Sequence, residues 1–191
     1  MRVKYITCGA DFRFGFKREG DIIDLRKKFK LTVVDDYIVN RTRVSTSIIK
    51  EFIADGLIEE ANNLLKAPYT ICGKVVHGNK IGRKLGYPTA NIEYQDYLLP
   101  KNGVYLTITT IKDIKYLSMT NIGFNPTINE QSKPRLEVHI LDFNEEIYDE
   151  EIEVSFIKYL REERKFNNKE ELINSLQETI NICREYKSMI E

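Results

Sequence analysis

Residues 73–91 read GKVVHGNKIGRKLGYPTAN, and this stretch decides how the rest of the chain is interpreted. No Asp or Glu occurs between Glu60 and Glu93, whereas five Lys or Arg side chains fall inside that window. The whole chain has 29 basic and 29 acidic side chains and a formal net charge of zero, so the window is locally basic in a neutral protein. A local excess of positive charge predicts an anionic ligand.

Glycine recurs every four residues in this stretch, at Gly78, Gly82 and Gly86. Glycine allows positive φ and lets backbone N–H groups approach phosphate oxygens without side chains intervening. Lys80 and Arg83 lie between these glycines and would add positive charge. The pattern therefore predicts a loop that holds the phosphates of a nucleotide.

The loop is followed by Pro88, which stiffens the backbone. If a strand begins here, its two-residue period places the Thr89 hydroxyl and the Asn91 amide oxygen on one face. Both are oxygen donors suited to a hard cation such as Mg²⁺. Because both are neutral, the ion would arrive with the phosphates of a nucleotide.

Spacing alone leaves a plainer alternative open. A basic, glycine-spaced loop is often only a solvated turn, and this one matches neither the Walker loop nor the dinucleotide-binding fingerprint. Arg83, Lys84, Tyr87 and Tyr94 could also form a basic and aromatic patch on a barrel that binds nucleic acid or flavin without catalysis. The zero net charge opposes a dedicated nucleic-acid binder.

Composition narrows the class of protein further. The 191 residues can form one domain or two small ones, and no apolar run is long enough to span a bilayer. Cys8, Cys72 and Cys183 are far apart and include no CxxC pair, which predicts free thiols and neither disulfides nor a zinc site. We expect a cytoplasmic protein with no membrane, nucleic-acid or obligate protein partner.

The chain before this stretch reads as a strand, a helix and a second strand, which is typical of part of a parallel α/β sheet. The expected elements are Val3 to Cys8, Asp21 to Lys30 and Leu31 to Tyr37. Two helices should follow, one capped among residues 45–47 and ended by Gly56, the other from Ile58 to Leu65. The punctuation at residues 66–68 predicts two domains, 1–66 and 67–191.

From Tyr69 onwards the sequence alternates short strands with turns and lacks intervening helices, which is typical of a closed antiparallel barrel. The expected strands are 69–76, 104–111, 116–121, 136–141 and 151–157. A last helix is expected after Asn167, with Asn167 as its N-cap and Glu170 three residues later. Its apolar stripe should pack on the barrel.

Glu137 is the candidate general base. In the strand 136–140, alternation buries Leu136, Val138 and Ile140 and leaves Glu137 and His139 on the opposite face. A carboxylate on a rigid strand can accept the proton of a hydroxyl that attacks phosphorus. The alternative is a solvated or salt-bridged glutamate. We interpret His139 as structural.

Several of these motifs together resemble the bacterial riboflavin kinase family over residues 69–187. Residues 88–91 reproduce its Pro-Thr-Ala-Asn tetrapeptide, and Glu137 with residues 139–143 matches the segment with its catalytic glutamate. Residues 121–127 match a turn that lies near the nucleotide in the family. The resemblance also implies that Arg161 helps to close over the flavin. Asp149 departs from the family, which usually has Gly there.

Residues 1–66 resemble the latter part of the FMN adenylyltransferase module that precedes the kinase in bacterial FAD synthetases. The matching pieces are Gly9 with residues 11–15, then residues 45–47, then Asp55 and Gly56. The opening strand with its paired-histidine motif is absent from this sequence, and Ile48 replaces a common arginine. The resemblance implies an incomplete module, so we expect no FAD synthetase activity.

The combined prediction is an α+β protein. A partial parallel, nucleotidyltransferase-like α/β piece should precede an antiparallel Greek-key β-barrel with a C-terminal helix. The resemblance implies a riboflavin kinase that uses ATP and Mg²⁺ to convert riboflavin into FMN, leaving ADP. The proposed nucleotide-binding residues are Gly78, Lys80, Gly82, Arg83, Gly86 and Pro88, with Thr89 and Asn91 as metal ligands, Glu137 as base and Arg161 at the flavin.

Overall fold

The computed structural model describes residues 3–78, 81–124 and 134–190. Its contacts divide the chain into two compact units, Met1–Thr46 and Ser47–Glu191. The boundary expected at residue 66 stays a prediction. Within the described residues, no helix is both long enough and apolar enough to cross a lipid bilayer.

The first unit is built on two parallel strands. These are β1 (Tyr5–Gly9) and β2 (Lys30–Val34), joined through a short 3₁₀ helix η1 (Phe16–Arg18) and helix α1 (Ile22–Arg26). A small hairpin of β3 (Ile38–Val39) and β4 (Thr42–Arg43) follows. The expected strand–helix–strand order is present, and the likeness to a nucleotidyltransferase stays a prediction.

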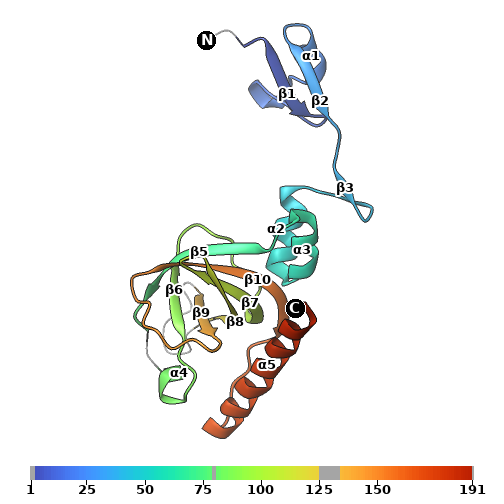
Figure 1. Ribbon diagram of the computed structural model, residues 1–191. Coiled ribbons are helices and arrows are strands. Elements are labelled where there is room, and N and C mark those ends of the chain that lie inside the picture. The colour runs from blue at the N-terminus through green and yellow to red at the C-terminus, as the bar shows by residue number, and fades with distance from the viewer. Residues whose placement is uncertain (1–2, 79–80, 125–133, 191) are drawn as a thin grey trace. The chain divides into compact units, whose positions relative to one another are not determined.

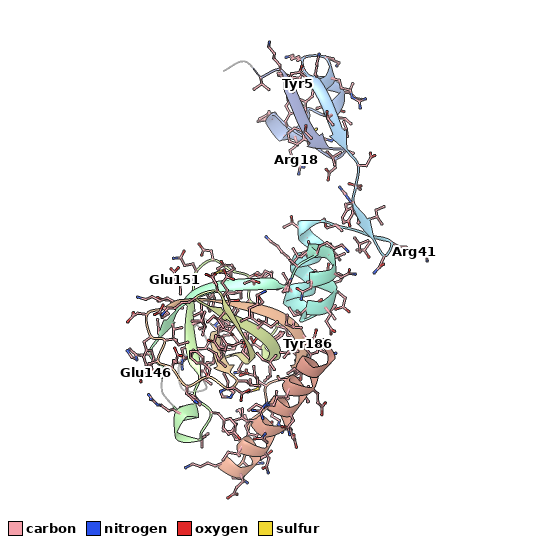
Figure 2. The ribbon with its side chains drawn as sticks, in the orientation of Figure 1. Tyr5, Arg18, Arg41, Glu146, Glu151 and Tyr186 are labelled. Carbon is pink, nitrogen blue, oxygen red and sulfur yellow. The ribbon has the colours of Figure 1, made fainter. Side chains whose placement is uncertain are left out.

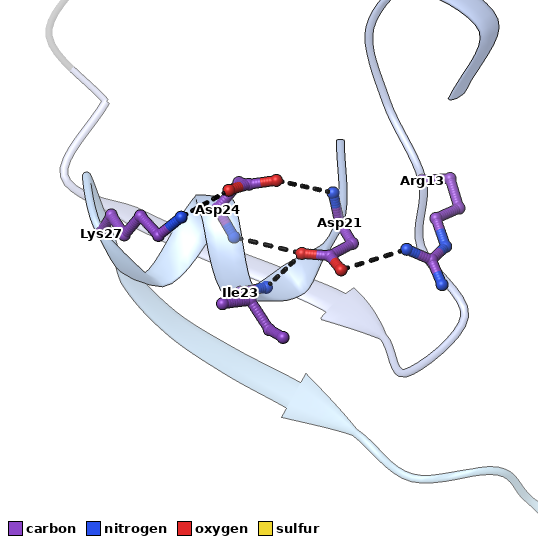
Figure 3. A network of polar contacts seen from close by, with 5 residues as sticks. All are labelled: Arg13, Asp21, Ile23, Asp24 and Lys27. Atoms are coloured by element: carbon purple, nitrogen blue, oxygen red, sulfur yellow. Dashed lines mark hydrogen bonds and ion pairs between the residues drawn. The ribbon is translucent and has the colours of Figure 1, made fainter. Parts of the chain in front are cut away.

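Helix α1 is shorter than the helix expected over residues 21–30, and its first turn explains where it begins. Asp21 accepts hydrogen bonds from the backbone N–H groups of Ile23 and Asp24, and Asp24 accepts one from the Asp21 N–H (Figure 3). Arg13 and Lys27 pair with these two carboxylates at 3.2 and 2.8 Å. This reciprocal cap fixes the start of the helix at residue 22.

The second unit begins with two helices, α2 (Thr46–Asp55) and α3 (Ile58–Leu65). Gly56 ends α2 at a φ of 79°, the left-handed region that glycine enters without strain. α3 packs against two strands of the barrel, β5 (Tyr69–Val76) and β10 (Glu151–Arg161), and buries Ile58, Ala61 and Leu64. Its observed bounds are those expected from the sequence.

The barrel is closed and antiparallel, as the sequence predicts (Figure 1). Its strands are β5 (Tyr69–Val76), β6 (Ala90–Tyr94), β7 (Gly103–Ile111), β8 (Ile114–Gly123), β9 (Arg135–Ile140) and β10 (Glu151–Arg161), and a short helix α4 (Ile81–Lys84) lies between β5 and β6. The order around the barrel is β10-β5-β6-β9-β8-β7. β6 therefore lies beside β9, which makes the arrangement of β6 to β9 a Greek key.

Strand β7 is buried on both faces because the barrel core lies on one side and helix α5 (Lys169–Ile190) on the other. Tyr105 points into the barrel core, whereas Val104 and Leu106 pack with Ile180 and Cys183 of α5. Figure 1 shows α5 running along the outside of the barrel. The C-terminal stripe thus packs on the barrel as predicted.

The predicted cap of α5 is wrong by one residue. Asn168 Oδ1 accepts the hydrogen bond of the Glu171 N–H at 2.8 Å, so Asn168 is the N-cap and not Asn167. Asn168 and Glu171 have the same three-residue spacing as Asn167 and Glu170, so the sequence pattern fits both registers. The Asn167 N–H instead donates to the Glu171 carboxylate at 3.0 Å.

Phe156 is the side chain whose loss should cost the barrel most. It is fully buried, and its ring centroid lies 5.2 Å from that of Tyr105 and 6.3 Å from that of Tyr69. We expect Phe156→Ala to lower the free energy of unfolding by about 3–5 kcal/mol, because the barrel cannot collapse around the cavity left behind. Urea denaturation measures this.

Ile114→Ala is the matched control, since Ile114 is 57% exposed at the start of β8. Its change should stay within about 0.5 kcal/mol. If both variants lost the same free energy of unfolding, packing in the barrel interior would not be the main source of stability.

Candidate active site

The glycines of the loop between β5 and β6 serve close backbone packing. The Tyr87 N–H donates to the Gly82 carbonyl at 2.9 Å, and a Cβ at Gly82 would lie only 2.3 Å from the Tyr87 carbonyl oxygen. Gly86 has a φ of 86°, which a side chain would strain. A Cβ at Gly78 would lie 2.1 Å from Asn91 Nδ2. The loop therefore closes on itself and contacts Asn91.

Three polar side chains form a row across adjacent strands. Asn91 of β6 is opposite Glu137 of β9, and Glu137 is opposite Asn121 of β8. Residues directly opposite each other in an antiparallel pair project from the same face of the sheet. The two-residue period also puts Thr89 on the side of Asn91. The barrel thus brings Thr89, Asn91 and Glu137 together.

A cavity of about 290 Å³, here called the outer cavity, lies between the outer face of the barrel and the chain from Arg161 to Leu176. Gly82, Thr89, Glu137 and Arg161 all line it. Its apolar wall consists of Leu85, Tyr87, Val104, Met119, Phe166, Leu172 and Leu176.

A second cavity of about 210 Å³, here called the mouth cavity, lies between the start of β6 and the loop 143–148. Arg83, Pro88 and Thr89 line it from one side, and Phe143, Ile147 and Tyr148 from the other. Thr89 lines both cavities. A ligand spanning the two would pass this residue.

Glu137 sits in a partly desolvated position. Its side chain is 33% exposed, and burial raises the pKa of its carboxyl group. The Arg135 guanidinium, 3.9 Å away, lowers the pKa, whereas the negative charge of Glu163 raises it. A carboxylate with a raised pKa is a stronger proton acceptor than an ordinary glutamate.

Arg161, Glu163 and Arg164 line the outer cavity where the chain leaves β10. Arg161 is half-buried, and its Nε donates to Thr179 Oγ1 at 3.3 Å. Burial lowers the pKa of its guanidinium group, and the charge of Arg164 adds to this. Glu163 accepts a hydrogen bond from Asn121 Nδ2 at 2.9 Å and fits only because Gly123 has no side chain.

Two basic side chains of residues 73–91 pair with acidic side chains from the segment between β9 and β10. Arg83 lies 3.4 Å from the Glu146 carboxylate, which Figure 2 shows at the end of the barrel near α4. Lys74 pairs with Asp149 at 2.7 Å. Asp149 has a φ of 66°, the conformation that glycine favours, so the turn is compatible with the glycine expected there.

Thr89 Oγ1 and Asn91 Oδ1 are oxygen donors of the kind that hard divalent cations take. Among the described residues, no three His, Cys, Asp or Glu side chains gather to hold a metal by themselves. The donor set therefore fits an ion whose other ligands come from a phosphorylated ligand. Lys80 and residues 125–127, which the sequence analysis singled out, lie outside the described residues.

Comparison with known proteins decides the family. The model of the riboflavin kinase family, described as "Flavokinase", matches residues 65–187. The chain belongs to the riboflavin kinase family. Over its whole length it is 39% identical to a bifunctional riboflavin kinase/FMN adenylyltransferase of Listeria monocytogenes and 38% identical to one of Buchnera aphidicola. It spans 62% and 64% of the length of these two relatives.

A solved structure is also similar over most of the chain. It is titled a macrolide-efflux protein from Streptococcus pneumoniae and has a TM-score of 0.84 at 34% identity. The similarity covers 92% of this chain and 58% of that one.

Within this riboflavin kinase family member, the sequence patterns assigned no role to several residues that line the two cavities. Glu163 and Arg164 join the outer cavity, and the loop 143–148 forms half of the mouth cavity. Glu163 and Arg164 follow Arg161, whose role the family resemblance already implied, whereas the loop 143–148 reaches the start of β6 only through the folding of the barrel. The alternative basic and aromatic patch is divided, because Tyr94 packs on the barrel core and Tyr87 on the cluster under α5.

Proposed function

We propose that this protein is a cytoplasmic riboflavin kinase that transfers the γ-phosphoryl group of ATP to the ribityl 5′-hydroxyl of riboflavin, giving FMN and ADP. One observation carries the proposal. Glu137 projects beside Asn91 into a cavity that Thr89 shares with a second cavity at the basic loop. A base and two oxygen donors are thus placed between two binding spaces, as a reaction between two substrates requires.

The two cavities differ in the chemistry they offer. The mouth cavity adjoins Arg83 and the glycine loop, and we assign it to ATP. The outer cavity has an apolar wall with the rings of Tyr87 and Phe166, and we assign it to the flat, aromatic flavin. Arg161 lies at the edge of the outer cavity, where its guanidinium can contact the flavin or the ribityl chain.

The mechanism assigns a task to each side chain. Backbone donors of the loop that contains Gly78, Gly82 and Gly86 would hold the phosphates, with Lys80 and Arg83 nearby, and Pro88 stiffens the end of this loop. Glu137 accepts the proton of the ribityl 5′-hydroxyl as that oxygen attacks the γ-phosphorus, and the bond from phosphorus to the bridging oxygen of ADP breaks. Positioning supplies most of the rate in such a transfer.

Thr89 and Asn91 would hold the divalent ion, which we propose is Mg²⁺. When bound, the ion neutralises charge on the phosphate oxygens. The two neutral ligands fit this use, since a site without its own carboxylate ligands binds Mg²⁺ weakly until phosphates are present.

We further propose that residues 1–66 are an incomplete FMN adenylyltransferase-like segment in front of the kinase domain, residues 67–191. Of the described apolar side chains in the first unit, only Leu25 and Val39 are buried, whereas Tyr5, Phe16 and Ile23 are 60–80% exposed. Parallel strands normally have both faces covered. The described part of this unit therefore resembles a fragment of a larger fold and should not catalyse adenylyl transfer.

Incubation of the purified chain with riboflavin, ATP and Mg²⁺, with FMN and FAD separated by chromatography, tests both proposals. We expect FMN and ADP in equal amounts and no FAD when FMN replaces riboflavin. Flavin binding without FMN would support the non-catalytic alternative. FAD formation would show that the first 66 residues are active.

A further inference from the structure

The side chain of His139, on strand β9, forms a hydrogen bond to the backbone of Pro88, which lies just before β6. Its Nδ1 lies 2.8 Å from the carbonyl oxygen of Pro88, and the side chain is only 8% exposed. A carbonyl oxygen can only accept, so Nδ1 carries the hydrogen and donates it.

The hydrogen bond from His139 to Pro88 lies just beyond the end of the backbone ladder between β6 and β9. The last pair between β6 and β9 is Ala90 with Val138, and Pro88 lies before the start of β6. Pro88 has no N–H with which to extend the ladder, and its carbonyl still needs a donor. The His139 imidazole supplies that donor and holds the chain that leads into β6.

Tyr87 holds the same segment from the side of α5. Its hydroxyl donates to Gln177 Oε1 at 3.1 Å, and its ring meets the His139 ring edge-on at a centroid distance of 5.7 Å. Residues 87 and 88 are therefore fixed by two contacts, one to α5 and one to β9. The Pro88 carbonyl and the Thr89 nitrogen belong to one rigid peptide plane.

We infer that His139 is a positioning residue for Thr89: by holding the Pro88 carbonyl it sets the direction of the Thr89 hydroxyl between the two cavities. The inference rests on the proposed function, in which Thr89 binds the metal of the ATP complex. His139 takes no part in proton transfer in this scheme. That role belongs to Glu137, the carboxylate opposite Asn91 in the strand register.

Two substitutions separate this role from bulk packing. Asn at residue 139 can place its Nδ2 near the position of the imidazole Nδ1 and donate to the same carbonyl, whereas Leu cannot donate. We expect His139→Leu to raise the KM for MgATP and the Mg²⁺ concentration for half-maximal rate by about tenfold or more, the usual effect of losing a group that orients a metal ligand. His139→Asn should restore most of both, and the KM for riboflavin should change little.

Thr109→Val controls for lost stability. Thr109 is fully buried in the barrel interior, its hydroxyl bonds to Ser118 at 2.7 Å, and neither residue lines either cavity. Thr109→Val should lower the unfolding midpoint but leave the KM for MgATP and the Mg²⁺ concentration for half-maximal rate unchanged. Calorimetric titration with MgADP gives the same comparison without turnover, so it separates failure of this inference from failure of the kinase assignment.

Equal MgATP and Mg²⁺ constants in wild type and His139→Leu would overturn the inference. A loss of kcat in His139→Asn as large as in His139→Leu, with KM unchanged, would also overturn it, because it would point to chemistry at the ring itself.

Discussion

Glu137→Gln should lower kcat by about a hundredfold or more while leaving the dissociation constants for MgATP and riboflavin within about twofold. Glutamine keeps the size and the carbonyl oxygen of the side chain but cannot accept the hydroxyl proton. The residue sits opposite Asn91 in the strand register and lines the outer cavity. Single-turnover kinetics with calorimetric binding would separate the chemical step from affinity.

The matched control is Glu162→Gln. Glu162 lies between Arg161 and Glu163 in the sequence, but its carboxylate pairs with Lys101 at 3.0 Å and it lines neither cavity. Glu162→Gln should leave kcat unchanged. If Glu137→Gln turned over at nearly the wild-type rate, the base would have to be another group.

The pH dependence of kcat/KM provides a second test of Glu137 as the general base. The base must be ionised, and burial raises the pKa of Glu137. The acid limb of kcat/KM should therefore lie above the pH of an ordinary glutamate, about 4.3. Because the pKa is higher in the folded than in the unfolded chain, ionised Glu137 disfavours folding at neutral pH, and this effect fades as the pH falls. Glu137→Gln should thus not lower the unfolding midpoint at pH 7.

Local sequence patterns were sufficient wherever a structural element has a clear period. The expected bounds of α3 and β5 are those observed, and alternation along β9 places Leu136 and Val138 in the core. The cap of α5 was misplaced because two adjacent Asn residues fit one pattern equally well. Periodicity identifies an element, whereas its first residue depends on which of two similar caps packs better.

The charge of the basic loop could not be judged from the sequence. The window from residue 61 to residue 92 contains no acid, yet Arg83 meets Glu146 and Lys74 meets Asp149 in the fold. These partners are separated by more than sixty residues and meet only because the turn before β10 returns to β5. Electrostatic character follows from spatial neighbours, so a linear count overstated the positive charge at the site.

Thr89→Val should be nearly as damaging as the loss of the base, and for a different reason. Valine has the shape of threonine and lacks the hydroxyl, so the variant removes one ligand of the ATP-bound ion without leaving a hole. An interaction with a charged partner contributes about 1.5–3 kcal/mol, which corresponds to about ten- to a hundredfold in kcat/KM for MgATP. Rates measured across a range of Mg²⁺ at fixed ATP should show a higher Mg²⁺ requirement.

Thr89→Ser supplies the control, because it keeps the hydroxyl and removes only a methyl group at an exposed position. It should retain a near wild-type Mg²⁺ requirement. The comparison also distinguishes Thr89 from Glu137, since excess Mg²⁺ should recover part of the rate of Thr89→Val and none of the rate of Glu137→Gln. If Val and Ser gave the same Mg²⁺ dependence as wild type, the hydroxyl would not be a ligand, and the residue shared by the two cavities would act only through its shape.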